Sequence, residues 1–208
     1  MLTLINDTFD FASALNIDCR KINFNLAYYE SEYDLNGFNK EFKSVLGENN
    51  KICDLSLKKY AKKYFDIDYI DFSNVEIIND FSGFNVAVYQ GFDASSFIDF
   101  LSKSKAKIIN FDLQNVENGH RFLNLDKSLA YKKAADIVLD AYDSGADFLV
   151  VGDDLSFKMF DALGVELQNI TNRDFSDFYI LHIAEFVALA NNKIPKTLKN
   201  HKLKVSLV

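Results

Sequence analysis

Short apolar segments alternate with longer amphipathic segments from residue 74 onward, and this alternation limits the fold more than any other feature of the chain. The apolar segments predict strands at 75–78, 85–89, 106–111, 147–151 and 165–170. The amphipathic segments predict helices at about 94–104, 126–143, 154–163 and 174–191. Strands that alternate with helices in this way form a parallel sheet whose two faces are covered by helices. The sequence therefore predicts an α/β fold with a largely parallel sheet flanked by helices.

The same pattern divides the chain into three parts. Residues 74–192 are expected to form the α/β domain, and residues 1–73 a smaller N-terminal α/β unit whose topology the pattern does not determine. Residues 193–208 are a basic tail with five lysines and no acidic residue. The end of this tail, 202–208, alternates in polarity, which is typical of an edge strand.

Charge and composition argue against several classes of protein. The formal net charge is −7, and residues 1–192 carry −12 because the tail holds five lysines. Phosphate neutralisation needs a basic face, so we expect no nucleic-acid partner. The longest apolar run, 178–190, is interrupted by His182 and Glu185 and is too short to span a bilayer, so we expect no membrane partner. The two cysteines are too few for a disulfide framework and no leader sequence is visible, so we expect a cytoplasmic protein.

Two strand-to-helix turns share a layout and predict a ligand crevice. In residues 86–101 and again in residues 148–163, a strand is followed by a glycine, an aspartate and a Ser-Phe pair. Helix N-termini at the carboxyl ends of parallel strands bind ligands in many α/β proteins, although aspartates at such turns also serve simply as helix caps. Any ligand is expected to contact these turns and the nearby loops, at Gly91, Asp93, Asp112, His120, Arg121, Gly152, Asp153, Asp154 and Ser156.

Residues 86–190 resemble the cysteine-rich (CCG) domain of the heterodisulfide reductase B-like family. That family has a "YxGC" turn, a "CCG" motif, a "GAD" segment leading into a strand and a "CPxC"-type turn, and a closing segment like "hLAELLALA". The corresponding segments here are "YQGF" at 89–92, "ENGHRF" at 117–122, "SGADFLVVGDDLSF" at 144–157 and "LHIAEFVALA" at 181–190. The resemblance implies the α/β framework of that domain.

The chain departs from this family at the residues that carry its chemistry. Where the family has cysteines, this sequence has Phe92, Glu117, Asn118, Asp153 and Ser156. Iron–sulfur clusters are held by thiolates. We therefore expect no iron–sulfur cofactor, no metal and no catalytic residue carried over from the family, and a colourless protein that binds no iron.

His182 and Glu185 also form a pair of chemical interest, three residues apart within the predicted helix 174–191. A buried histidine that is hydrogen-bonded to a carboxylate or a carbonyl explains this pair better than a metal site or an acid–base pair does. Nucleophile, zinc and dinucleotide motifs are not found in the sequence.

These observations favour a non-catalytic interaction or scaffold protein, derived from a redox subunit, with a protein partner that the sequence does not identify. The oligomeric state is not indicated. One alternative is a magnesium-dependent, phosphate-handling enzyme, which requires that the strand before Asp112 and the strand before Asp153 and Asp154 be neighbours so that the carboxylates converge. A second alternative is a small-molecule sensor that uses the Gly152–Asp153–Asp154 turn.

Overall fold

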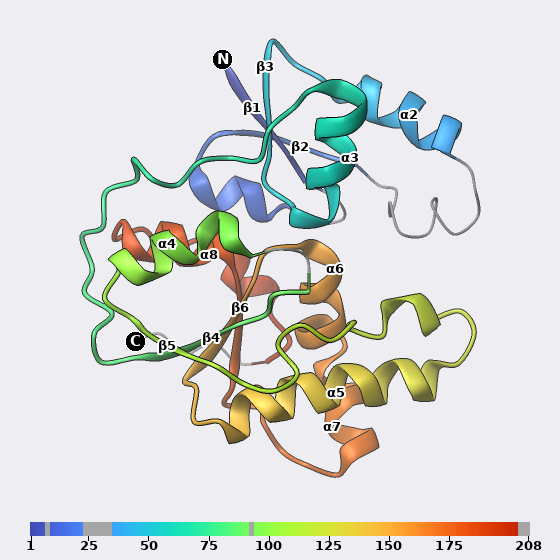
Figure 1. The fold of residues 1–208 in the computed structure, drawn as a ribbon, viewed down its shortest axis with the longest axis vertical. Helices are drawn as coiled ribbons and strands as arrows, with labels where there is room; N and C mark the ends of the chain where they lie inside the picture. Colours follow the sequence, from blue (N-terminus) through green and yellow to red (C-terminus); the bar gives the residue numbers. More distant parts are fainter. Residues whose placement is uncertain (7–8, 23–34, 92–93, 204–208) are drawn as a thin grey trace.

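The computed structural model describes residues 1–6, 9–22, 35–91 and 94–203, and it confirms an α/β fold built on parallel strands. The strands in the described residues form two sheets, one of three strands in the order β2-β1-β3 and one of four strands in the order β5-β4-β6-β7. Every pairing within these sheets is parallel. Figure 1 shows the smaller sheet with α2 and α3 at the top and the larger sheet below it.

The larger sheet follows the predicted alternation over much of its length. Its strands are β4 (Asn85–Val88), β5 (Lys107–Ile109), β6 (Phe148–Val151) and β7 (Tyr179–His182). The helices around it are α4 (Ser95–Lys103), η2 (His120–Phe122), α5 (Lys127–Asp143), α6 (Asp154–Phe157), η3 (Lys158–Ala162), α7 (Gly164–Thr171) and α8 (Ile183–Ala190). Helix α5 begins where the sequence predicts, because the Asp126 carboxylate accepts a hydrogen bond from the backbone N–H of Leu129 (3.0 Å) and caps the helix.

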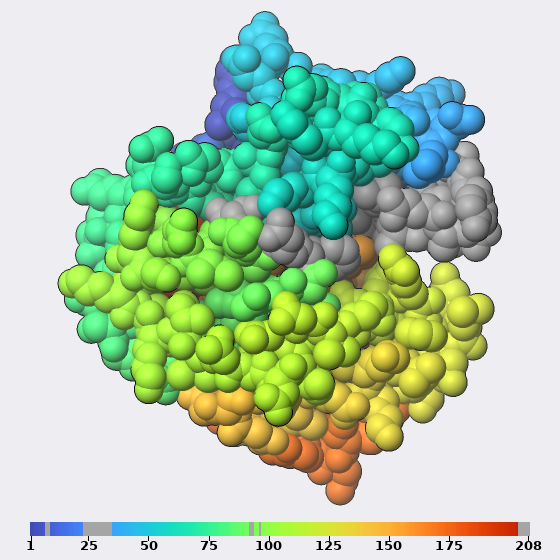
Figure 2. Space-filling model, viewed as in Figure 1, coloured from blue at the N-terminus to red at the C-terminus, as the bar shows by residue number. Residues whose placement is uncertain are grey.

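The N-terminal residues form the smaller sheet. Its strands are β1 (Leu2–Asn6), β2 (Asp18–Lys21) and β3 (Asn49–Ile52), and its helical segments are η1 (Phe11–Leu15), α2 (Leu35–Ser44) and α3 (Leu55–Phe65). Helices α2 and α3 pack together on one face of the sheet around Phe38, Phe42 and Tyr60. Both helices lie on the outer surface of the molecule (Figure 2).

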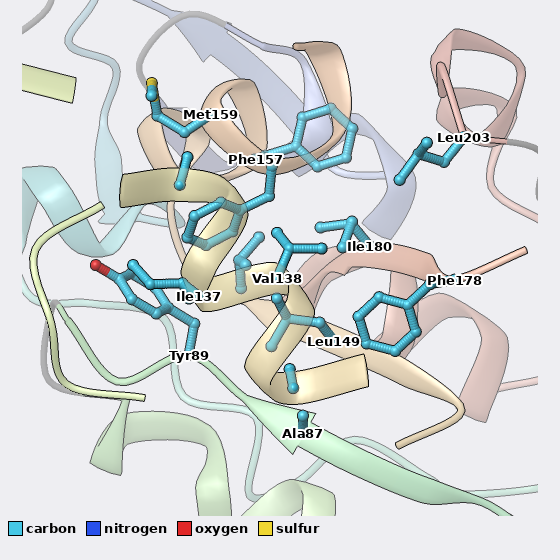
Figure 3. Packing of buried hydrophobic residues seen from close by; sticks show 14 of the residues in the cluster. Ala87, Tyr89, Ile137, Val138, Leu149, Phe157, Met159, Phe178, Ile180 and Leu203 are labelled. Carbon is cyan, nitrogen blue, oxygen red and sulfur yellow. The ribbon is translucent and has the colours of Figure 1, made fainter. Parts of the chain in front are cut away.

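Helices cover both faces of the larger sheet. On one face, Ala87 and Leu149 pack against Ile137 and Val138 of α5, as Figure 3 shows. On the other face, apolar residues of the sheet pack against α4 and α8. Burial of each large apolar side chain stabilises the fold by about 1.5–3 kcal/mol. These two layers therefore hold the strand ends of the larger sheet in place.

Two predicted strands are wrong. Residues 165–170 belong to helix α7, in which Leu167 alone among the apolar residues is fully buried, while Val165 and Ile170 remain exposed. Residues 75–78 lie in an irregular connection that crosses the end of α8, where the N–H of Ile78 donates to the Ala190 carbonyl (2.8 Å). In both segments, packing against a neighbouring element outweighs the strand preference of β-branched residues.

The predicted single helix at 174–191 is also wrong. Residues Tyr179–His182 form strand β7, and helix α8 begins only at Ile183. Uniform apolarity suits a buried strand as well as a buried helix, so periodicity does not separate the two. The predicted helix 154–163 likewise divides into α6, one turn long, and a π-helical segment, η3.

The carboxyl ends of the two sheets meet. Strand β1 ends at Asn6, β3 is followed by Asp54, and both residues contact the turn after β6 through Asp154. The N–H of Leu55 donates to the carbonyl of Gly152 at the same place (2.8 Å). The two edges at which α/β proteins bind ligands therefore face each other.

The tail differs from the predicted edge strand in its described part. Residues Lys196–Asn200 form a short 3-10 helix, η4, and residues 204–208 lie outside the described residues. Among the described helices, none has the length and apolarity needed to cross a membrane.

Candidate functional site

The turn Gly152–Asp153–Asp154 lies at the junction of the two sheets, and the space beside its glycine is filled. A Cβ atom built on Gly152 would overlap the side chains of Leu55, from α3, and Phe97, from α4. Glycine, which has no Cβ, lets other elements of the same chain pack closely against the backbone here. The sequence predicts that a ligand approaches the backbone of Gly152 closely. In the structure, protein side chains occupy that place.

Asp153 caps helix α6 and is buried. Its Oδ1 atom accepts a hydrogen bond from the N–H of Ser156 (2.7 Å), and the residue is 1% exposed. Burial, together with the nearby charge of Asp54, raises the pKa of Asp153 to about 8. Asp153 therefore binds a proton in the folded state at a pH where an exposed aspartate is ionised.

Asp154 joins the turn to the N-terminal sheet. Its Oδ2 atom accepts hydrogen bonds from Asn6 Nδ2 (3.1 Å) and from the backbone N–H of Phe9 (2.6 Å). Its own N–H donates to Asp54 Oδ2 (3.1 Å). Asp154 and Asp54 are both fully buried, so these bonds form away from water, where removing one partner costs most. We call Asn6, Phe9, Asp54 and Asp154 the joint.

A second connection links two of the turns in which the family has cysteines. Asn118 Nδ2 donates to Ser156 Oγ (3.1 Å), and the N–H of His120 donates to Asn118 Oδ1 (3.0 Å). The Tyr89 hydroxyl donates to the carbonyl of Val116 in the same loop (2.8 Å). Asn118 and Ser156 are thus used in contacts within the protein.

The structure brings together only part of the predicted crevice. Asp153, Asp154 and Ser156 are buried at the junction with Gly152, whereas Asp112 is exposed beyond the end of β5. Strand β4 lies between β5 and β6, so the strands that the magnesium hypothesis requires to be neighbours are not neighbours.

The remaining predicted residues lie in loops. A Cβ atom on Gly91 would overlap the Tyr89 side chain, and Asp93 lies outside the described residues. His120 and Arg121 begin η2. Burial, with the charges of Lys158 and Arg121, lowers the pKa of His120 to about 4, so the imidazole is neutral at pH 7. Arg121 is exposed.

His182 and Glu185 form a capping box at the start of α8. His182 is buried, as expected from the sequence, but its side chain accepts a bond from a backbone N–H and is not hydrogen-bonded to a carboxylate or a carbonyl of any described residue. His182 Nδ1 accepts a hydrogen bond from the N–H of Ala184 (3.2 Å), and Glu185 Oε2 accepts one from the N–H of His182 (3.1 Å). The imidazole stacks on the Phe11 ring with centroids 4.7 Å apart, and burial lowers the pKa of His182 to about 3.

A buried charge cluster escaped the sequence analysis. His201, from the tail, places Nε2 3.1 Å from both carboxylate oxygens of Glu185 and Nδ1 3.4 Å from Asp161 Oδ1. Thr197 Oγ1 also donates to Glu185 (2.5 Å). The available signal was a pair of acidic residues, Asp161 and Glu185, each within an apolar helical segment, because a buried carboxylate requires partners. The cluster fastens the tail to α8 and η3.

The donor set does not fit an iron–sulfur cluster. The described turns at which the family has cysteines offer carboxylate, amide and hydroxyl groups, and the two thiols lie elsewhere, on and beside the smaller sheet. Burial raises the pKa of Cys19 to about 12 and that of Cys53 well above its usual range, so both thiols stay protonated and are poor ligands. Among the described residues, no group of three or more histidine, cysteine and acidic side chains is placed to hold a metal ion.

Comparisons with known proteins support the framework. The family model for the HdrB-like C-terminal domain matches residues 120–202. The chain is similar to the crystal structure of a hypothetical protein from Helicobacter pylori, with a TM-score of 0.78 and 17% identity. That similarity covers 100% of this chain and 53% of the other, so the chain spans about half the length of its structural neighbour and shares its fold. No curated protein matches.

The matched range overlaps residues 120–190 of the predicted resemblance, extends it through the tail to 202, and leaves residues 86–119 without a match. The resemblance to the heterodisulfide reductase B-like family predicted from the sequence is confirmed over residues 120–202, where the chain is similar to the HdrB-like C-terminal domain.

Proposed function

We propose that the chain is a non-catalytic interaction or scaffold protein that descends from a redox subunit and no longer carries its cluster. The observation that carries this proposal is the joint. The Asp154 carboxylate, in the turn that resembles a cluster-binding turn, accepts its hydrogen bonds from Asn6 and Phe9 of the N-terminal unit. The turn that contains Asp154 therefore binds the N-terminal unit of the same chain.

The chemistry of the other turns supports the same conclusion. A cluster in this domain would need thiolates. Asp153 instead caps α6 by accepting a hydrogen bond from the N–H of Ser156, and the Ser156 hydroxyl accepts one from Asn118. These polar contacts replace the bonds that a cofactor would make. The buried apolar layers on both sides of the larger sheet stabilise the fold without one.

The magnesium-dependent alternative is less well supported, because Asp112 is exposed and β4 separates β5 from β6. A sensor that uses the turn would have to displace the side chains that fill the space at Gly152. We therefore infer a protein partner, with the cytoplasm as the place of the interaction.

Anaerobic reconstitution with iron and sulfide tests the loss of the cluster. The purified chain is expected to remain colourless and to bind no stoichiometric iron, and visible absorbance with bound iron would refute the proposal. A thermal-shift screen with Mg²⁺, Mn²⁺, nucleotides and phosphosugars tests the alternatives, since a ligand of the native state raises its stability by RT ln(1 + [L]/Kd). A metal-dependent shift that Asp153→Ala abolishes would favour the enzyme.

A further inference from the structure

An apolar cavity lies between η1, the connection that leads from α3 to β4, and the end of α8. Its volume is about 260 Å³. Three elements contribute its apolar walls: η1 through Ala14 and Leu15, the connection through Phe72 and Val75, and α8 through Val187 and Ala188. The residues that line it include none of the joint and none of the predicted crevice. The cavity is therefore a separate candidate for a binding site.

The elements around the cavity are fixed to one another. The N–H of Ile78 donates to the carbonyl of Ala190 (2.8 Å) and holds the connection to α8. Segment η1 packs against α8, and the Phe11 ring at its start stacks on His182, the residue directly before α8 (Figure 1). A preformed cavity needs little ordering when a ligand enters, and this favours binding.

The chemistry of the lining favours an uncharged, apolar ligand. The charged residues among those that line the cavity are Glu76 and Lys193, which are exposed and of opposite sign, so they favour neither an anion nor a cation. The Asn191 amide already donates to the carbonyl of Glu76 (3.0 Å). No described residue of the lining has a buried side-chain nitrogen or oxygen atom without a hydrogen-bond partner. A polar ligand would therefore lose its hydrogen bonds to water without replacing them.

The volume of the cavity limits the size of the ligand. An apolar cavity of about 150 Å³ accommodates benzene, so a cavity of about 260 Å³ has room for about ten nonhydrogen atoms. The buried Phe72 ring forms part of the wall, and aromatic rings pack favourably against one another. A rigid ring compound also loses less conformational freedom on binding than a flexible chain does.

We propose that this cavity binds a small, uncharged ring compound of about ten nonhydrogen atoms. The ligand would contact η1 and α8 together, and so would stabilise the contact between the N-terminal unit and the α/β domain. The proposal does not rest on the interaction role, and its site is distinct from the Gly152–Asp153–Asp154 turn.

Fluorescence titration with N-methylindole tests the inference. This probe is uncharged, is of the size that the cavity accommodates, and has no N–H group that would need a partner. The chain contains no tryptophan, so emission of the indole ring comes from the probe alone. The emission is expected to shift to shorter wavelength with saturable binding of one probe per chain, because the probe leaves water for an apolar site.

Two substitutions fill the cavity from different elements. Ala188→Leu on α8 and Ala14→Leu on η1 are each expected to raise the dissociation constant of the probe at least about tenfold, which corresponds to about 1.4 kcal/mol. The matched control is Ala162→Leu, which makes the same change at a partly exposed position of η3 outside the cavity and should alter binding less than about twofold. Circular dichroism establishes which variants fold, and either cavity variant is sufficient for the test.

Absence of saturable binding, unchanged binding in the cavity variants, or an equal loss in the control would each overturn the assignment. Tighter binding of indoleacetate or of decanoate than of N-methylindole would show that the site selects an acid, and would overturn the uncharged class. Probe binding that weakens as the protein concentration rises would show that a second copy of the chain fills the cavity, and would overturn the small-molecule assignment.

Discussion

At the scale of single residues, the buried titratable groups differ in the charge that the fold favours. The fold favours the neutral forms of Asp153 and His182, because burial raises the free energy of the charged form of each side chain. Burial alone would lower the pKa of His201, but its hydrogen bonds to Asp161 and Glu185, and their charges, raise it to about 9. Each group therefore contributes to stability in its own pH range.

Replacing Asp153 by asparagine should change the pH dependence of stability. The pKa of Asp153 is raised in the folded state from 3.8 to about 8, so its contribution is present below pH 3.8 and is lost as the pH rises through 8. The free energy of unfolding of the unmodified chain, measured with urea, should therefore fall relative to Asp153→Asn across this range, by up to about 1.4 kcal/mol per pH unit. A difference between the two proteins that is independent of pH would contradict the assignment.

Removing the His201 side chain should destabilise the protein strongly. His201→Ala leaves Asp161 and Glu185 buried without their cation, which costs about 3–5 kcal/mol in urea unfolding at pH 6. Because the pKa of His201 rises from 6.5 to about 9 on folding, the effect should be largest below pH 6.5 and should shrink as the pH rises from 6.5 through 9. Lys199→Ala, at an exposed position in η4, is the control and should change stability by less than about 0.5 kcal/mol. A loss below about 1 kcal/mol for His201→Ala would mean that the cluster contributes little.

At the scale of elements, the helices and strands that could be predicted from the sequence are those marked by residues close by in the chain. The cap at Asp126 and the apolar runs of β4, β5 and β6 were recognisable because caps and buried strands depend on nearby residues. The change from β7 to α8 had such a signal too, since His182 and Glu185 form a capping box with histidine in the place usually taken by serine or threonine. The joint had none, because Asn6 and Asp154 are 148 residues apart.

The position of the turn at the sheet edge could be predicted from the sequence, but its contacts could not. The turn at 152–154 does lie at the carboxyl edge of the sheet. The sequence does not reveal that the carboxyl edge of the second sheet faces this turn, because the arrangement depends on how the two sheets pack together. The sequence predicted that a ligand lies close to Gly152. In the structure, the side chains of Leu55 and Phe97 lie there instead.

A methyl group at position 152 should therefore disturb the packing of α3 and α4 against the turn. Gly152→Ala is expected to cost about 1–3 kcal/mol in urea unfolding, since Leu55 and Phe97 must move to make room. Gly83→Ala is the matched control, because a Cβ atom there meets no atom within 4 Å. Its stability should stay within about 0.5 kcal/mol of the unmodified chain or rise slightly. Equal effects at the two glycines would show that the turn is not tightly packed.

At the scale of the whole molecule, the joint makes two parallel sheets into one structure. Hydrogen bonds from Asn6, Phe9 and Asp154 cross between the sheets in a buried region, and the tail is fastened on the other side through His201. The central claim is that Asp154 serves this joint and not a cofactor or substrate.

A double-mutant cycle on Asn6 and Asp154 tests that claim most directly. The free energies of unfolding of Asn6→Ala, Asp154→Ala and the double variant are measured with urea at pH 7. The account predicts a coupling energy of about 1–3 kcal/mol, because a buried side-chain hydrogen bond joins the two residues. Additive effects, with a coupling energy below about 0.3 kcal/mol, would contradict the account, since the turn would then not hold the two sheets together.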